Sequence, residues 1–148
     1  MSATTANKAL VRRYIDELWN GGDLTALDRL VASGFAGRDP ATRGVPRGRA
    51  DLGRLVASYR TALPDLHVTL EQQVAEGECV ATRWTARGTH RGYLGAIGPT
   101  GRPVVIGGLS LHRVRADRLA EEWTSFDALA LVQHLWALPA RAPAVHAA

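Results

Sequence analysis

The sequence predicts an α+β fold in one domain, with helices first, strands after them and one helix at the end. Changes of periodicity carry this prediction. Apolar residues recur at helical spacing up to Pro64, and beyond it they alternate with polar residues at the two-residue spacing of strands. Helical spacing returns after Asp127. A chain of 148 residues with 46% hydrophobic and 22% charged residues can bury the core that such layers need.

Three helices are expected before the first strand. The first covers residues 8–20, where apolar residues form one helical face, and it ends at a Gly–Gly pair. Asp23 is suited to cap a second, shorter helix. A connection rich in Gly, Pro and Arg follows over residues 35–49, and such long connections often form the rim of a pocket. A third helix over residues 50–63 ends at Pro64.

Four strands are then expected as antiparallel neighbours, followed by a closing helix. The strands cover residues 66–77, 78–90, 102–115 and 119–127. The apolar face of the closing helix carries Leu129, Val132, Leu135 and Trp136. Residues 1–6 are small and polar and residues 139–148 read PARAPAVHAA, so we expect flexible tails around a domain over residues 7–138.

Composition argues against several classes of protein. The sequence has no run of about 18 apolar residues and no basic, apolar leader, so we expect neither a membrane span nor secretion, and we expect a cytoplasmic protein. Cys79 is the only cysteine, which excludes an internal disulfide and a thiolate cluster, and no metal site is predicted. The net charge of +4 comes from scattered arginines, so no nucleic-acid partner is expected.

The last predicted strand carries the main candidate for acid/base chemistry. Trp123, Ser125 and Asp127 alternate onto one face of this strand. If that face lines a cavity, burial raises the pKa of the Asp127 carboxyl above about 3.9, toward a useful range. Alternatively, Asp127 caps the closing helix that begins directly after it, and bonds from backbone N–H groups would then lower its pKa. The residues alone leave both readings open.

Two other strands hold further polar candidates. Ser110 and His112 share one face of the third strand, where His112 can form a proton relay with a carboxylate on the next strand or stand in solvent. Arg83 shares a face of the second strand with Thr85 and Arg87, and which face points inward is open. Arg83 can stabilise an anionic intermediate or form a surface ion pair.

A glycine-rich string, GTHRGYLGAIGPTGRPV over residues 88–104, lies between the second and third strands. Its glycines permit tight turns, and Tyr93 with its apolar neighbours can form a mobile flap over a pocket mouth. His90 either touches a substrate at the rim or is held by its own turn. Arg38 and Asp39, in the earlier connection, are expected to form a solvated loop pair.

This string, followed by EEWTSFD ending at Asp127, resembles the SnoaL-like polyketide cyclases of the nuclear-transport-factor-2-like superfamily. The resemblance covers nearly the whole domain. It implies a cone in which a curved antiparallel sheet wraps around the N-terminal helices and encloses an apolar pocket. It also implies Asp127 as general acid/base and His112 as its assisting histidine. Many relatives have a histidine before Asp–Pro, where this chain has Arg38, so the polar lining has changed there.

The activity that the resemblance implies is cofactor-independent cyclisation of a small, polyketide-like substrate by an intramolecular aldol-type reaction. Asp127 would remove a proton next to a carbonyl group. Substrate contacts are expected from His90, Arg83, Trp123, Ser125, Tyr93 and Ser110. Two alternatives stay open: a polyketide hydroxylase, cofactor-free or two-component, and a non-catalytic module that binds a small ligand. The resemblance further implies a homodimer formed through the exposed face of the sheet.

Overall fold

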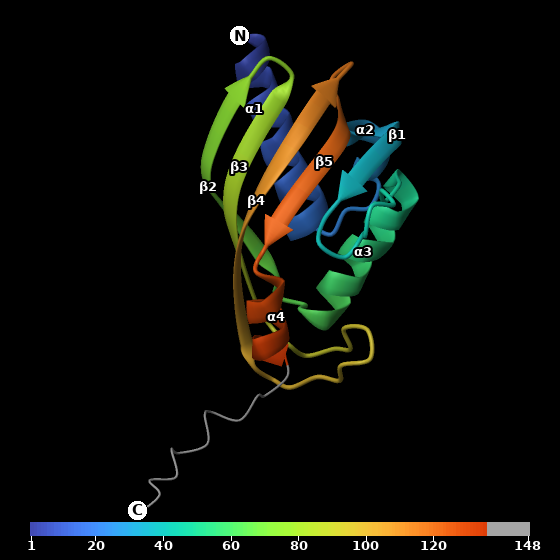
Figure 1. Ribbon diagram of the computed structural model, residues 1–148, viewed down its shortest axis with the longest axis vertical. Helices are drawn as coiled ribbons and strands as arrows, with labels where there is room; N and C mark the ends of the chain where they lie inside the picture. Colours follow the sequence, from blue (N-terminus) through green and yellow to red (C-terminus); the bar gives the residue numbers. More distant parts are fainter. Residues whose placement is uncertain (136–148) are drawn as a thin grey trace, which may run out of the picture.

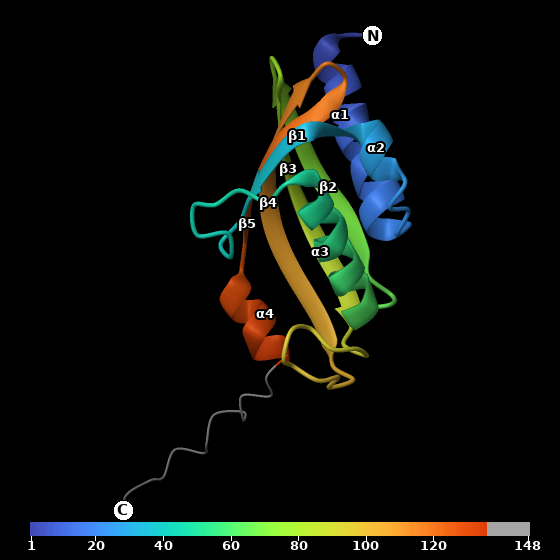
Figure 2. The ribbon, with the colours of Figure 1, turned by 90° about the vertical axis from the view of Figure 1, so that its right-hand side faces the viewer.

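Five strands form one curved, open sheet, and the N-terminal helices and α3 cover its inner face (Figures 1 and 2). The structure is a computed structural model that describes residues 1–135. The sheet order is β1-β5-β4-β3-β2. The strands are β1 (Val31–Arg38), β2 (His67–Glu76), β3 (Cys79–Thr89), β4 (Pro103–Arg115) and β5 (Arg118–Phe126). The predicted α+β class, with a curved sheet around N-terminal helices, is confirmed.

The helices are α1 (Ala3–Arg13), η1 (Tyr14–Asn20), α2 (Ala26–Leu30), α3 (Arg49–Ala62) and α4 (Ala128–Leu135). The first helix is longer than expected: it begins at Ala3, after Ser2, whose hydroxyl accepts a bond from the amide of Thr5. Residues 3–6, expected in a flexible tail, are therefore helical. The predicted tail over residues 139–148 and Trp136 lie outside the described residues.

The second half of this first helix is a π-helix, η1. It ends where predicted, at the Gly–Gly pair, since Gly22 has a φ of 67° that a side chain would strain. The predicted cap of the next helix is wrong. The capping position of α2 is Thr25, whose side chain makes no capping hydrogen bond. The Asp23 carboxylate accepts a bond from the amide of Thr25, which lies before the helix begins.

Strand β1 is the main departure from the predicted order of elements. It lies between α2 and α3 and pairs in parallel with β5, so the sheet is mixed and three helices do not precede every strand. Its sequence, VASGFAGR, contains two glycines and no clean alternation, which are weak strand signals. The open edge of β5 supplies the hydrogen-bonding partner that the local sequence does not reveal. The other four strands occupy their predicted ranges within two residues.

The core falls into two clusters that share the inner face of the sheet. The larger one joins the N-terminal helices and α3 to the upper part of the sheet in Figure 1, and includes Val11, Leu52 and Val80. The smaller one lies where the loop over residues 90–102 meets α4, and includes Val104 and Leu135. Within residues 1–135 no helix is long and apolar enough to cross a membrane.

The burial pattern shows which side chains point inward. β4 alternates cleanly between buried and exposed positions, with Ser110 and His112 on the buried face. On β3 the inward face is the one that carries Val80, Thr82, Trp84 and Ala86. Arg83 therefore lies on the outer face, which answers the question that the sequence left open.

Candidate active site

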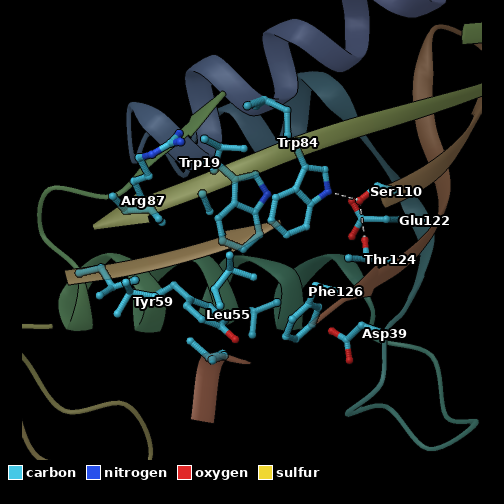
Figure 3. Close-up of a pocket in the computed structure, with 18 of the residues that line it drawn as sticks. Trp19, Asp39, Leu55, Tyr59, Trp84, Arg87, Ser110, Glu122, Thr124 and Phe126 are labelled. Atoms are coloured by element: carbon cyan, nitrogen blue, oxygen red, sulfur yellow. Dashed lines mark hydrogen bonds between the residues drawn. The ribbon is translucent and has the colours of Figure 1, made fainter. Parts of the chain in front are cut away.

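A largely apolar cavity lies between the inner face of the sheet, η1 and α3, with α4 at one end (Figure 3). Its empty volume is about 870 Å³, including the open mouth. The lining residues are Tyr14, Ile15, Trp19, Asp39, Leu55, Tyr59, Leu63, Leu66, Val68, Trp84, Ala86, Arg87, Val104, Ile106, Ser110, Glu122, Thr124, Phe126 and Leu131. The indole rings of Trp19 and Trp84 are among the lining side chains, so a ligand there meets flat aromatic surfaces.

Glu122 on β5 is the centre of a hydrogen-bonded network at the cavity wall. Its Oε2 accepts a bond from the hydroxyl of Tyr14 at 3.0 Å and lies 2.7 Å from Nε2 of His112. The antiparallel register of β4 and β5 places His112 directly opposite Glu122. Among the described residues, Oε1 of Glu122 has no hydrogen-bond partner. One carboxylate oxygen is thus fixed by the protein while the other is open to a ligand.

The π-helical form of η1 explains how Tyr14 and Trp19 act together. A π-helix joins residues five apart by hydrogen bonds, so residues five apart lie near one face, which is not true of an α-helix. Tyr14 and Trp19 have this spacing, and the indole N–H of Trp19 donates to the Tyr14 hydroxyl at 3.1 Å. Because that bond occupies the Tyr14 oxygen as an acceptor, the phenol proton is directed to Glu122.

Burial controls the charge state of the tyrosine in this network. Tyr14 has no exposed surface, and burial together with the negative charge of Glu122 raises its pKa well above the ordinary value. It therefore stays a neutral donor. His112 is 1% exposed and its ring packs edge-on against Tyr14, with 5.4 Å between ring centres. Nδ1 of His112 is buried without a partner in the described chain, so Nε2, which faces Glu122, is the ring nitrogen that takes part in the network.

A second chain of hydrogen bonds crosses the cavity wall beside Glu122. The indole N–H of Trp84 donates to the Ser110 hydroxyl at 3.0 Å, and this hydroxyl lies 2.8 Å from that of Thr124. If Ser110 donates onward, Thr124 is left with a proton to offer to the cavity. Gly108 makes room for this arrangement, because a Cβ there would stand 2.3 Å from the Trp84 ring.

The connection after β1 forms part of the cavity wall, as predicted for a pocket rim. Asp39 lines the cavity, and its Oδ2 accepts a bond from the guanidinium of Arg47 at 2.8 Å. Its Oδ1 accepts a bond from the amide of Ala41. The expected solvated pair of Arg38 and Asp39 is therefore wrong. Arg38 instead lies over the ring of Trp123, 5.7 Å from its centre.

Comparison with known proteins identifies the family of this chain. Residues 9–135 match the family model of the SnoaL-like polyketide cyclases. The chain belongs to this family. It is similar to IdmH, a suggested polyketide cyclase from Streptomyces antibioticus, with 32% identity, a TM-score of 0.77 and coverage of 87% of this chain and 97% of that one.

Two further solved structures resemble this SnoaL-like protein. AclR, a suggested hydroxylase from Streptomyces galilaeus, is 25% identical, with a TM-score of 0.81 and coverage of 93% of this chain and 85% of that one. A suggested polyketide cyclase from Acidithiobacillus ferrooxidans is 25% identical, with a TM-score of 0.79 and coverage of 91% and 97%. None of the curated proteins matches the chain.

Asp127 lies outside the cavity lining of this SnoaL-like chain. Its side chain is exposed and accepts a bond from the amide of Ala130 at 2.8 Å, so it caps α4. The premise that its strand face lines the cavity is wrong: Glu122, Thr124 and Phe126 line it, and Trp123 and Ser125 lie on the outer face with Asp127. The side chains of β5 alternate between two faces as predicted, but the face that lines the cavity is the other one.

The other predicted site residues are divided between the cavity and the surface. Ser110 lines the cavity, and His112 lies behind Glu122. Arg83 is exposed on the outer face of β3, and Tyr93 is 69% exposed in the loop. These two side chains are not brought to the cavity in this conformation.

His90 is held by its own turn. Its Nδ1 accepts a bond from the amide of Thr100 at 3.2 Å and lies 3.0 Å from the hydroxyl of that residue. Its backbone is bonded to Gly101 and Arg102, which closes the base of the loop. The ring is fully buried and does not line the cavity.

Sequence reasoning missed Tyr14, Trp19, Trp84, Glu122 and Thr124 as site residues. One available signal was the strand register. If His112 points inward on β4, a tight hairpin at residues 116–117 places a residue near 122 opposite it. The pairing of Tyr14 with Trp19 had no such signal, because their spacing is unsuited to an α-helix.

Proposed function

We propose that the protein is a cofactor-independent cyclase that closes a ring in a polyketide-like substrate by an intramolecular aldol-type reaction, with Glu122 as general base and acid. The observation that supports this most directly is the Glu122 carboxylate at the wall of an apolar cavity, with Oε2 held by two donors and Oε1 open. A base must be oriented and must also reach its proton, and this arrangement provides both.

In the proposed reaction, Glu122 and Thr124 of β5 have separate roles: proton transfer and stabilisation of the enolate oxygen. Oε1 of Glu122 takes a proton from a carbon next to a carbonyl group, and the resulting enolate carbon attacks a second carbonyl carbon of the same molecule. The new alkoxide recovers the proton from Glu122, so atoms and charge balance and the mass of the product equals that of the substrate. The Thr124 hydroxyl, supported by Ser110 and Trp84, is placed to donate to the enolate oxygen.

The other residues of the network act through Glu122. Tyr14 and His112 fix the carboxylate but are separated from a ligand by it or by their burial, so we assign them positioning roles. The rings of Trp19 and Trp84 exclude water and suit a flat, conjugated substrate.

A matched pair of amide variants tests the assignment. Glu122→Gln and Asp127→Asn each replace one carboxylate of the same segment, and asparagine keeps the capping ability of Asp127. Each protein is incubated with a panel of anthraquinone-type polyketide esters, and the products are analysed by mass spectrometry. We expect a product of unchanged mass and new retention time with wild type and Asp127→Asn, and its loss with Glu122→Gln.

Other outcomes would name a different function. Loss of product only in Asp127→Asn would return the catalytic role to Asp127. Gain of one oxygen would indicate hydroxylation, the activity suggested for the similar protein AclR. Binding of the panel without any product would favour a non-catalytic ligand-binding module.

We also propose that the protein forms a homodimer through the outer face of the sheet. This face carries exposed apolar side chains along β4, with Val105, Leu109 and Leu111 at 44%, 54% and 39% exposure. Trp123 on β5 lies opposite Leu111 and extends the same surface. Burial of such a surface against a second copy would remove apolar area from water.

A further inference from the structure

Tyr59 places a phenol hydroxyl on the helix side of the cavity. It follows Leu55 by one turn on α3, and both line the cavity. Figure 3 shows Tyr59 on the wall formed by α3, away from Glu122 on β5. Its ring leans on that of Trp19, with 6.1 Å between ring centres and 57° between ring planes. The contact with Trp19 and the helix backbone fix the direction of the phenol.

The hydroxyl of Tyr59 differs from the other hydroxyl and indole groups of the lining. Those of Tyr14, Ser110 and Thr124 and the indole N–H groups of the two tryptophans are all bonded within the protein. The Tyr59 hydroxyl has no hydrogen-bond partner among residues 1–135. Because this hydroxyl is not among the buried atoms without a partner, it stays accessible at the cavity wall, and a bound molecule can supply its partner.

The surroundings of Tyr59 indicate which kind of group it binds. Burial, and then the negative charge of Asp39, raise the pKa of Tyr59, while Arg47 opposes the shift. The phenol is therefore a proton donor and seeks an acceptor. The carboxylate of Asp39 is paired with the guanidinium of Arg47, so neither charge calls for an ionic partner at the hydroxyl, and a neutral carbonyl oxygen fits this setting.

We propose that the Tyr59 hydroxyl binds a neutral carbonyl oxygen of a flat, polycyclic substrate, on the wall opposite Glu122. The inference rests on the proposed function for the reacting end of that substrate. The ring system lies between the aromatic walls, its reacting carbonyl meets Thr124 and Glu122, and a second, non-reacting oxygen meets Tyr59. The proposal therefore requires a substrate that carries a second, non-reacting carbonyl oxygen at the end that meets Tyr59.

A binding experiment without turnover tests this proposal. The probes are anthraquinone-2-carboxylate and anthracene-2-carboxylate, which share the ring frame and the charged group and differ in the two quinone oxygens. Affinity is followed by quenching of tryptophan fluorescence. We expect wild type to prefer the quinone, and Tyr59→Phe to bind the quinone about three- to tenfold more weakly, the factor for one neutral hydrogen bond, with the affinity for the anthracene unchanged.

Tyr93→Phe is the matched control, because Tyr93 is exposed in the loop and should leave both affinities unchanged. Equal affinity of Tyr59→Phe and wild type for the quinone would overturn the proposal, as would the absence of quinone binding or of any preference in wild type. The Glu122→Gln variant should keep the preference for the quinone. Retained turnover in that variant would contradict the proposed function of Glu122 without contradicting the binding role of Tyr59.

Discussion

Replacing Tyr14 by phenylalanine isolates the hydroxyl at the centre of the buried network. The ring is fully buried and is kept, while one oxygen is removed. That oxygen accepts the Trp19 indole N–H at 3.1 Å and donates to Glu122 at 3.0 Å. The variant leaves the indole N–H without its partner and leaves the carboxylate with His112 as its only donor in the described chain.

The expected loss follows from these two bonds. A neutral hydrogen bond contributes about 1 kcal/mol net and one to a charged group about 1.5–3 kcal/mol, so the free energy of unfolding should fall by about 2–4 kcal/mol. Urea denaturation at pH 7 measures the change. Tyr59→Phe is the control, since it removes an unbonded hydroxyl and should alter the free energy by less than about 0.5 kcal/mol. Equal losses in the two variants would refute the network.

The same variant has a signature at alkaline pH. The folded state raises the pKa of Tyr14 above the unfolded value of about 10, so the neutral phenol is the form that folding favours. This stabilisation is complete below pH of about 10 and is lost as the pH rises from there through the folded value. Tyr14→Phe should therefore flatten the fall in unfolding free energy above pH of about 10. An unchanged slope would show that Tyr14 is not the titrating group.

Three further changes have specific expected outcomes. Gly108→Ala should displace the Trp84 ring, seen as altered near-UV circular dichroism and weaker quinone binding. Gly107→Ala should leave both unchanged, because a Cβ there would lie 4.0 Å from the backbone oxygen of Trp84. Asp127→Ala should cost about 0.5–2 kcal/mol in urea denaturation through loss of the α4 cap, and Asp127→Asn much less. Leu109→Glu should convert the proposed dimer to a monomer in sedimentation, and a monomeric wild type would contradict the dimer.

The strands after Pro64 show what the sequence can specify. Their period of two predicts each range and the pairs of residues that share a face, and the structure confirms both. It does not predict which face is inside, because β5 carries aromatic residues on both, with Phe126 inward and Trp123 outward. The pattern therefore suits Asp127 as the cavity carboxylate as well as it suits Glu122, which is the one that lines the cavity.

Two features depended on contacts that no local pattern encodes. β1 has a weak strand sequence and forms against the free edge of β5, more than 80 residues later. Tyr14 and Trp19 share a face only because the helix takes the π form between them. The strongest local signal, the glycine-rich string, described a loop held by His90 and contributed no polar group to the cavity lining.

Glu122 and His112 belong to one hairpin, separated by 10 positions, whereas Tyr14 joins them from 108 positions away. The proposed base and the histidine that positions it are thus neighbours in a local unit that forms with little loss of chain entropy. The opposite wall, with Tyr59 and Leu55, comes from a separate helix. Substitutions on that helix are expected to change which molecule binds without moving the proposed base, so substrate preference and the proposed proton transfer can be altered independently.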